Sequence, residues 1–99
     1  MTYLDELAIE IERQVPGELV PDEDTSSLFR LYAVLALAKG QAVNAVDVHN
    51  AWVAWMQERD PAHRSIKPFE ELDAETQAGD EPFVRAIRTV AERLERVPA

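Results

Sequence analysis

The sequence contains no cysteine, only three glycines and no long hydrophobic run. Without cysteine, the chain can form neither disulfide bonds nor zinc–thiolate sites. Three scattered glycines cannot build a glycine-rich phosphate-binding loop. The longest apolar run, LFRLYAVLALA, has about 11 residues, whereas a membrane-spanning helix needs about 18 or more. The N-terminus lacks the basic, apolar and small-residue regions of a secretory signal. We therefore expect a cytoplasmic protein with no membrane partner.

Basic residues are also scarce. The chain has ten Lys and Arg and nineteen Asp and Glu, which give a net charge of −9. Such a balance disfavours direct binding to the phosphate backbone of nucleic acids. The charge is uneven: residues 1–27 hold eight acids and one arginine, whereas residues 84–97 hold four arginines and two glutamates. We therefore expect no direct nucleic-acid partner, and interpret the arginines near the C-terminus as part of a solvated helix face.

The spacing of apolar residues predicts a single all-α domain over residues 1–99, a compact bundle of about five helices, four substantial and one short, with no sheet. Residues 1–40 are expected to form the first two helices. Thr2 and Asp5 resemble a capping box at the start of the first helix, which a Pro-Gly pair ends. The second helix, from Ser27 to the residue before Gly40, is apolar on almost every side. It is therefore expected to be the buried centre of the bundle.

Three further helices are predicted in the second half of the chain. The third begins at Asn44, ends near Pro61 and carries an apolar stripe of Val48, Trp52, Trp55 and Met56. A short helix is predicted over residues 68–77, with Phe69 and Leu72 pointing inward. Asp80 is expected to cap the last helix, which Pro98 closes. The apolar stripe of this last helix consists of Phe83, Ile87, Val90 and Leu94.

No arrangement of residues in the sequence is typical of a catalytic or metal site. The only two histidines, His49 and His63, are too far apart in sequence to lie on one element, and no His-Glu-x-x-His pattern occurs. Ser26 and Ser27 lie at an expected helix cap rather than beside a base. We therefore expect no enzymatic activity, no catalytic residue, no metal and no cofactor.

Residues 49–72, HNAWVAWMQERDPAHRSIKPFEEL, hold both histidines and both tryptophans of the chain. Val48-His49-x-x-Trp52 is followed by His63-x-x-Ile66-x-x-Phe69-x-x-Leu72, and Asp80 comes eight residues later. Over residues 46–95, this pattern resembles the repeat domain of ryanodine receptors, which also occurs as a small RyR-like domain in bacteria and phages. The sequence departs from the family in having Arg64 where proline is usual, in lacking a Gly-Trp segment, and in having a shorter loop.

The resemblance implies a non-catalytic ligand-binding module of a phage or bacterial accessory protein. The implied ligand is a nucleotide-like small molecule, held in a cleft between the third helix and the loop that follows it. A tryptophan can stack on a base, and a histidine or arginine can bind a phosphate. The candidate ligand-binding residues are His49, Trp52, Trp55, His63, Arg64 and Phe69.

Packing offers a second interpretation of the same residues. Trp52 and Trp55 lie on the stripe that faces the second helix, which favours a role in the core. His49 falls one position beyond this stripe and is interpreted as a boundary residue that hydrogen-bonds a loop carbonyl. His63 fits the capping of its own loop as well as it fits ligand binding. Phe69 is predicted to be a core residue.

The alternative function is that of a protein-interaction factor or homodimeric adaptor that docks on a host protein. Apolar residues outside the predicted core stripes support such a surface, namely Tyr3, Ile9 and Leu19. The acidic first quarter of the chain also fits a mimic of DNA. A cavity lined by both histidines and at least one exposed tryptophan would favour the ligand-binding function, whereas a filled core with an exposed apolar patch would favour the partner.

Overall fold

The computed structural model describes residues 1–96, which form helices and turns without any strand. The α-helices of this part are α1 (Tyr3–Gln14), α2 (Ser26–Lys39), α3 (Ala45–Met56), α4 (Ala74–Ala78) and α5 (Glu81–Arg96). Short 3-10 turns are η1 (Gly17–Leu19), η2 (Gly40–Ala42) and η3 (Phe69–Glu71). The predicted class, all-α with four substantial helices and one short helix, is confirmed for these residues. The predicted closure at Pro98 lies outside the described residues.

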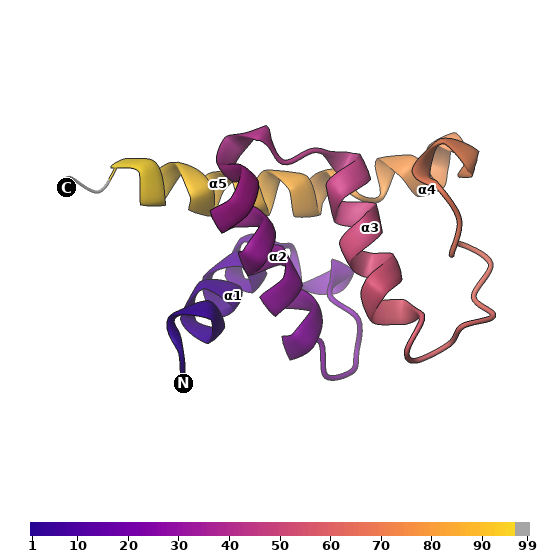
Figure 1. Ribbon diagram of the computed structural model, residues 1–99, viewed down its shortest axis with the longest axis horizontal. Coiled ribbons are helices and arrows are strands. Elements are labelled where there is room, and N and C mark those ends of the chain that lie inside the picture. Colours follow the sequence, from indigo (N-terminus) through magenta and orange to yellow (C-terminus); the bar gives the residue numbers. More distant parts are fainter. Residues whose placement is uncertain (97–99) are drawn as a thin grey trace.

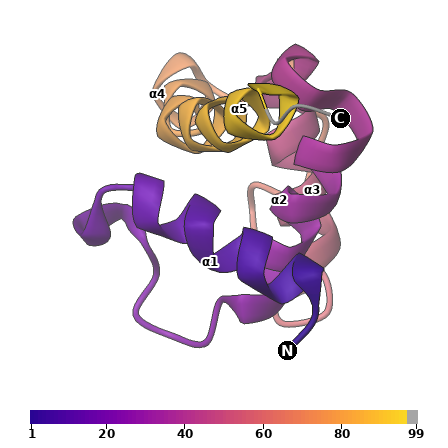
Figure 2. The same cartoon turned by 90° about the vertical axis from the view of Figure 1, so that its left-hand side faces the viewer.

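Helix α2 is central in the bundle, because it contacts α1, α3 and α5. In Figure 1, α5 runs along the long axis of the molecule, α2 and α3 cross it, and α4 lies at its N-terminal end. Figure 2, turned by 90°, shows α1 below α5. Within residues 1–96, no helix combines the length and the apolar character that crossing a membrane requires.

Two capping boxes begin α1 and α3, as the sequence predicts. The Thr2 side chain accepts a hydrogen bond from the Asp5 backbone N–H at 3.3 Å, and Asp5 accepts one from the Thr2 N–H at 3.0 Å. Asn44 and Asp47 repeat this exchange at the start of α3. Because each box satisfies backbone donors that a helix start leaves unpaired, it fixes where the helix begins. The second box thereby sets which residues of α3 face α2.

The predicted burial of α2 on every side is wrong for one face. Its inner face is buried, with Leu28, Phe29 and Tyr32 among its core residues. Val34 and Leu37, in contrast, are 48% and 50% exposed. Since α1, α3 and α5 pack against the other sides of the helix, no described element covers this face. The apolar residues of α2 are therefore divided between a core and a surface.

Two predictions near the C-terminus are also wrong. The single short helix predicted over residues 68–77 is split into η3 and α4, because Leu72 is extended and Asp73 accepts a hydrogen bond from the Thr76 N–H at 2.8 Å. A residue that caps a helix has an extended backbone, so no helix can run through it. In α5, the stripe is buried at Ile87 and Val90, but Leu94 is 39% exposed.

Candidate functional site

A cavity of about 370 Å³ lies where α2, α3, α4 and the start of α5 meet. Six of its lining residues belong to the helices, namely Leu28, Tyr32, His49, Trp52, Thr76 and Phe83. Gly79 and Asp80, just before α5, contribute two more. The rest come from the first connection and from the loop after α3, namely Leu19, Pro21 and Ser65. Four of these side chains are aromatic rings, and none belongs to Lys or Arg.

The acidic group of this cavity is Asp80, the residue immediately before α5. Its carbonyl oxygen accepts hydrogen bonds from the N–H groups of Phe83 and Val84 at 3.1 and 3.0 Å, which places it at the helix N-terminus as predicted. Its carboxylate oxygen Oδ2, however, is buried and has no hydrogen-bond partner. Burial raises the pKa of Asp80 to about 6, and the His49 imidazole opposes this shift only in part. The carboxylate is therefore a strong acceptor without a protein donor at Oδ2.

Tyr32 forms a buried wall of the cavity on the α2 side. Its ring packs edge-on against Phe29, with centroids 5.4 Å apart, and lies 5.9 Å from the ring of Phe83. Burial raises the pKa of Tyr32, and the nearby Asp80 carboxylate raises it further. The phenol therefore stays protonated at neutral pH and can act as a hydrogen-bond donor.

The opposite wall is formed by His49 and Trp52 on α3. His49 is only 3% exposed, and its Nε2–H donates to the Lys67 carbonyl oxygen at 2.7 Å. Its ring stacks on Trp52 with the centroids 5.8 Å apart, and Trp52 itself is half-buried. The predicted hydrogen bond from His49 to a loop carbonyl is thereby confirmed, whereas its predicted boundary position is wrong, because the side chain is buried. The hydrogen bond holds the loop after α3 against the helix, and both rings line the cavity.

His63 and Phe69 support this wall from outside the cavity. The His63 ring lies edge-on to Trp52 at 5.0 Å, and its Nδ1 accepts a hydrogen bond from the Ser65 N–H at 3.1 Å. His63 therefore caps its own loop. The Phe69 ring lies 6.2 Å from that of His49 and is half-buried rather than fully in the core. Four of the six candidate residues thus form one connected aromatic cluster.

The other two candidates, Trp55 and Arg64, are not part of the cavity. Trp55 is 3% exposed, and its Nε1–H donates to the Ser27 hydroxyl at 3.1 Å. The Arg59 guanidinium covers its ring at 4.0 Å from the centroid. Trp55 is therefore a core residue. Arg64 is exposed and does not line the cavity.

Several residues of the cavity are absent from the sequence-based candidates, and Asp80 is the most important of them. In the sequence, an aspartate before Glu81-Pro82 indicates a helix cap and nothing more. Tyr32 and Phe83 belong to apolar stripes and therefore indicate core positions. No local pattern shows that α5 begins against α2 and α3, and this packing is what buries the Asp80 carboxylate.

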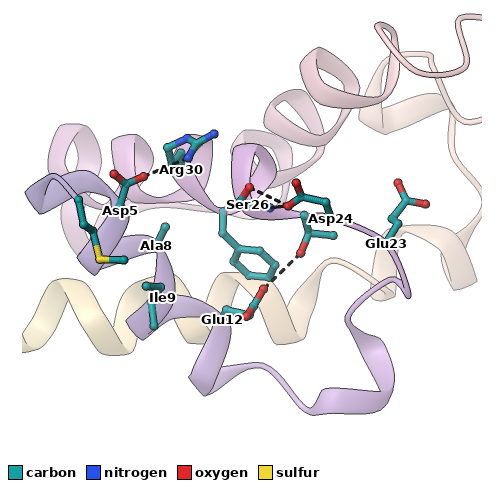
Figure 3. Close-up of a pocket in the computed structure, with 11 residues that line it drawn as sticks. Asp5, Ala8, Ile9, Glu12, Glu23, Asp24, Ser26 and Arg30 are labelled. Carbon is teal, nitrogen blue, oxygen red and sulfur yellow. Dashed lines mark hydrogen bonds and ion pairs between the residues drawn. The ribbon is translucent and has the colours of Figure 1, made fainter.

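A second cavity, of about 500 Å³, lies between α1 and the start of α2 (Figure 3). Its polar side chains already have partners within the protein. Arg30 pairs with Asp5 at 3.0 Å, and the Thr25 hydroxyl donates to Glu12 at 3.2 Å. Asp24 accepts from the Ser26 N–H at 3.0 Å. Because these groups are satisfied, this cavity offers a ligand less unused hydrogen-bonding capacity than the one at Asp80.

The chain belongs to a protein family described as a domain of unknown function (DUF7701), whose model matches residues 2–92. No curated protein and no solved structure gives a significant match. The family match covers α1 to α4 in full and α5 as far as residue 92.

Proposed function

We propose that this protein is a non-catalytic binding module that takes a small, flat, nucleotide-like molecule in the cavity between α2, α3 and the start of α5. The observation that carries the proposal is that Asp80, which has a buried carboxylate oxygen without a partner, lines a cavity together with four aromatic rings. The volume of about 370 Å³ lies within the range of small-molecule sites. Aromatic walls are suited to stacking on a planar ligand.

The polar groups of the cavity support a non-catalytic role in this proposal. His49 is the one imidazole lining the cavity, and its Nε2–H is already bonded to the Lys67 carbonyl. Within residues 1–96, no group of three or more His, Asp or Glu side chains is arranged to hold a metal ion. Binding is therefore the role that this proposal gives to Asp80.

The resemblance to RyR-like domains supports a binding site in the same region of the chain. Not all of the resembling residues line the cavity, however. His49 and Trp52, which belong to the resembling pattern, line the cavity, and His63 and Phe69 pack behind them. Asp80, at the end of that pattern, supplies the carboxylate. The site that we propose is thus deeper in the bundle than a cleft at the loop.

A thermal-shift screen of nucleobases, nucleosides, nucleotides and small heteroaromatic amines tests this function. A ligand present at about 100 times its Kd stabilises the folded state by about 2.7 kcal/mol. For a chain of this length, such a gain raises the melting temperature by about 10 °C or more. We expect at least one planar compound in the screen to produce a shift of this kind.

A cavity-blocking variant, Thr76→Phe, shows whether the shift arises from this site. Thr76 lines the cavity, so a larger side chain there is expected to abolish the shift. Thr89→Phe is the matched control, because it makes the same change on α5 outside the cavity. A shift that persists in Thr76→Phe would place the ligand elsewhere, and a screen without any shift would contradict the function.

Docking on a partner protein or on a second copy of the chain is the alternative, and exposed apolar side chains support it. Tyr3 is 70% exposed, and Val34 and Leu37 on the open face of α2 are about half exposed. Exposed apolar groups of this kind are used in protein interfaces when they form a contiguous patch. A screen without shifts, combined with a dimeric mass in light scattering, would favour this alternative.

A further inference from the structure

Asp80 is the one acidic residue among the residues that line this cavity. Its Oδ2 atom is buried and unpartnered, and a buried acceptor without a donor is costly to maintain. Asp80 comes directly before α5, where an aspartate can use its side chain to cap the helix, yet Oδ2 takes no part in capping. Because Asp80 lines the cavity, a ligand N–H group at its carboxylate would supply a donor that the protein does not.

The remaining lining offers an anion no lysine or arginine side chain. None of the eleven lining residues is a lysine or arginine. A phosphate or carboxylate in this space would lie near the negative charge of Asp80 with no cation to compensate it, and like charges at short range in a poorly solvated site repel strongly. The donors on the walls, such as the Tyr32 hydroxyl, are neutral.

Aromatic rings line this cavity on both the α2 and the α3 side. The rings of Tyr32 and Phe83 have centroids 5.9 Å apart, and Trp52 stacks with His49 on the α3 side. Aromatic faces attract cations and stack on planar heterocycles. A flat group that carries N–H donors at one edge therefore fits both the walls and the carboxylate.

We infer that the part of the ligand that enters this cavity is a planar N–H-donating group, cationic or neutral, such as an amidine or an aminoheterocycle, and that Asp80 selects it by accepting its hydrogen bonds. This inference rests on the proposed function and narrows it. A nucleotide-like ligand would insert its base and keep its phosphates outside. Asp80 is then the residue that determines specificity.

Three probes of nearly equal shape test the inference: benzamidine, benzamide and benzoate. Their binding is measured at neutral pH by titration of the backbone amide signals in NMR, with shifts at His49, Trp52 and Phe83 as the reporters. Hydrogen bonds to a charged group contribute about 1.5–3 kcal/mol. Benzamidine is therefore expected to bind about tenfold more tightly than benzamide, or better, and benzoate is expected to cause no shifts at these residues.

The variant Asp80→Asn is expected to remove this preference, so that benzamidine binds no more tightly than benzamide. Asp73→Asn, the same change at the N-terminus of α4, is the control and should leave the preference intact. If benzoate binds as tightly as benzamidine, or if Asp80→Asn keeps the preference, the inference is overturned while the cavity remains a binding site. If none of the probes shifts the reporters, the proposed function is contradicted as well.

Discussion

Replacing Asp80 with asparagine is expected to make the folded protein more stable at neutral pH. Burial raises the pKa of this carboxyl from 3.8 to about 6, so the folded state disfavours the charged form. A shift of about two pKa units corresponds to about 3 kcal/mol. Since the residue as a whole is partly exposed, solvent reduces the effect, and we expect a gain of about 1–2 kcal/mol. Each kcal/mol raises the melting temperature by about 4–8 °C.

The pH dependence of this gain follows from proton linkage. Between about pH 4 and pH 6, the folded protein binds more protons at Asp80 than the unfolded chain does. The stability that Asp80 contributes in wild type is therefore fully present below about pH 4 and is lost as the pH rises through about 6. Asparagine does not titrate, so the advantage of the variant should be absent at low pH and complete at neutral pH.

The side chains near Asp80 influence how far its pKa is raised. His49 on α3 opposes the shift in pKa, whereas Tyr32 on α2 is neutral at these pH values. Denaturant unfolding of wild type and Asp80→Asn across this pH range measures the difference. Asp73→Asn is the matched control, because the pKa of Asp73 is lowered by its hydrogen bonds to Thr76 and no gain is expected there. Equal stabilities of wild type and Asp80→Asn at neutral pH would contradict the account.

Removing the His49 side chain is expected to have the second large effect, a loss of about 2–4 kcal/mol. His49→Ala leaves the Lys67 carbonyl without its donor, which costs about 1–3 kcal/mol when the group is buried. The loss of the stacked contact with Trp52 adds about 0.5–1.5 kcal/mol. The loop after α3 should then exchange its amide hydrogens faster than in wild type.

His49→Gln is the matched variant, because its amide N–H can still donate to the Lys67 carbonyl. We expect it to recover part of the lost stability and most of the protection of residues 63–67 from hydrogen exchange. Denaturant unfolding and hydrogen-exchange mass spectrometry provide the two measurements. If His49→Gln is as unstable as His49→Ala, the hydrogen bond to Lys67 contributes little and packing dominates.

The features that could be predicted from the sequence depend on residues close together in the chain. The boxes at Thr2 and Asn44 could be predicted because each involves residues three positions apart. Gly40 was expected at the end of α2, and it has the positive φ of 56° that favours glycine there. The division at Leu72 was missed, although Asp73 followed three residues later by Thr76 is itself a local capping pattern.

The features that could not be predicted depend on contacts between distant segments. Whether Val34 or Phe29 is buried depends on which sides of α2 its neighbours cover, and periodicity cannot separate them in a helix that is apolar all round. Periodicity also cannot separate the two tryptophans, because both lie on the apolar stripe of α3. Trp55 packs under Arg59, whereas Trp52, three residues earlier, lines the cavity. The position of Asp80 directly before a helix is a local feature that the sequence predicts. Its burial, in contrast, arises only when the helices pack together.

The titration of the Asp80 carboxyl, followed by NMR with and without benzamidine, tests the central claim most directly. In the protein without ligand, the Asp80 carboxyl should titrate with a pKa of about 6. Bound benzamidine supplies the N–H groups and the positive charge, and should therefore lower this pKa well below its value in the free protein. An Asp80 carboxyl that titrates near 3.8 in the free protein, and that benzamidine does not affect, would contradict the account.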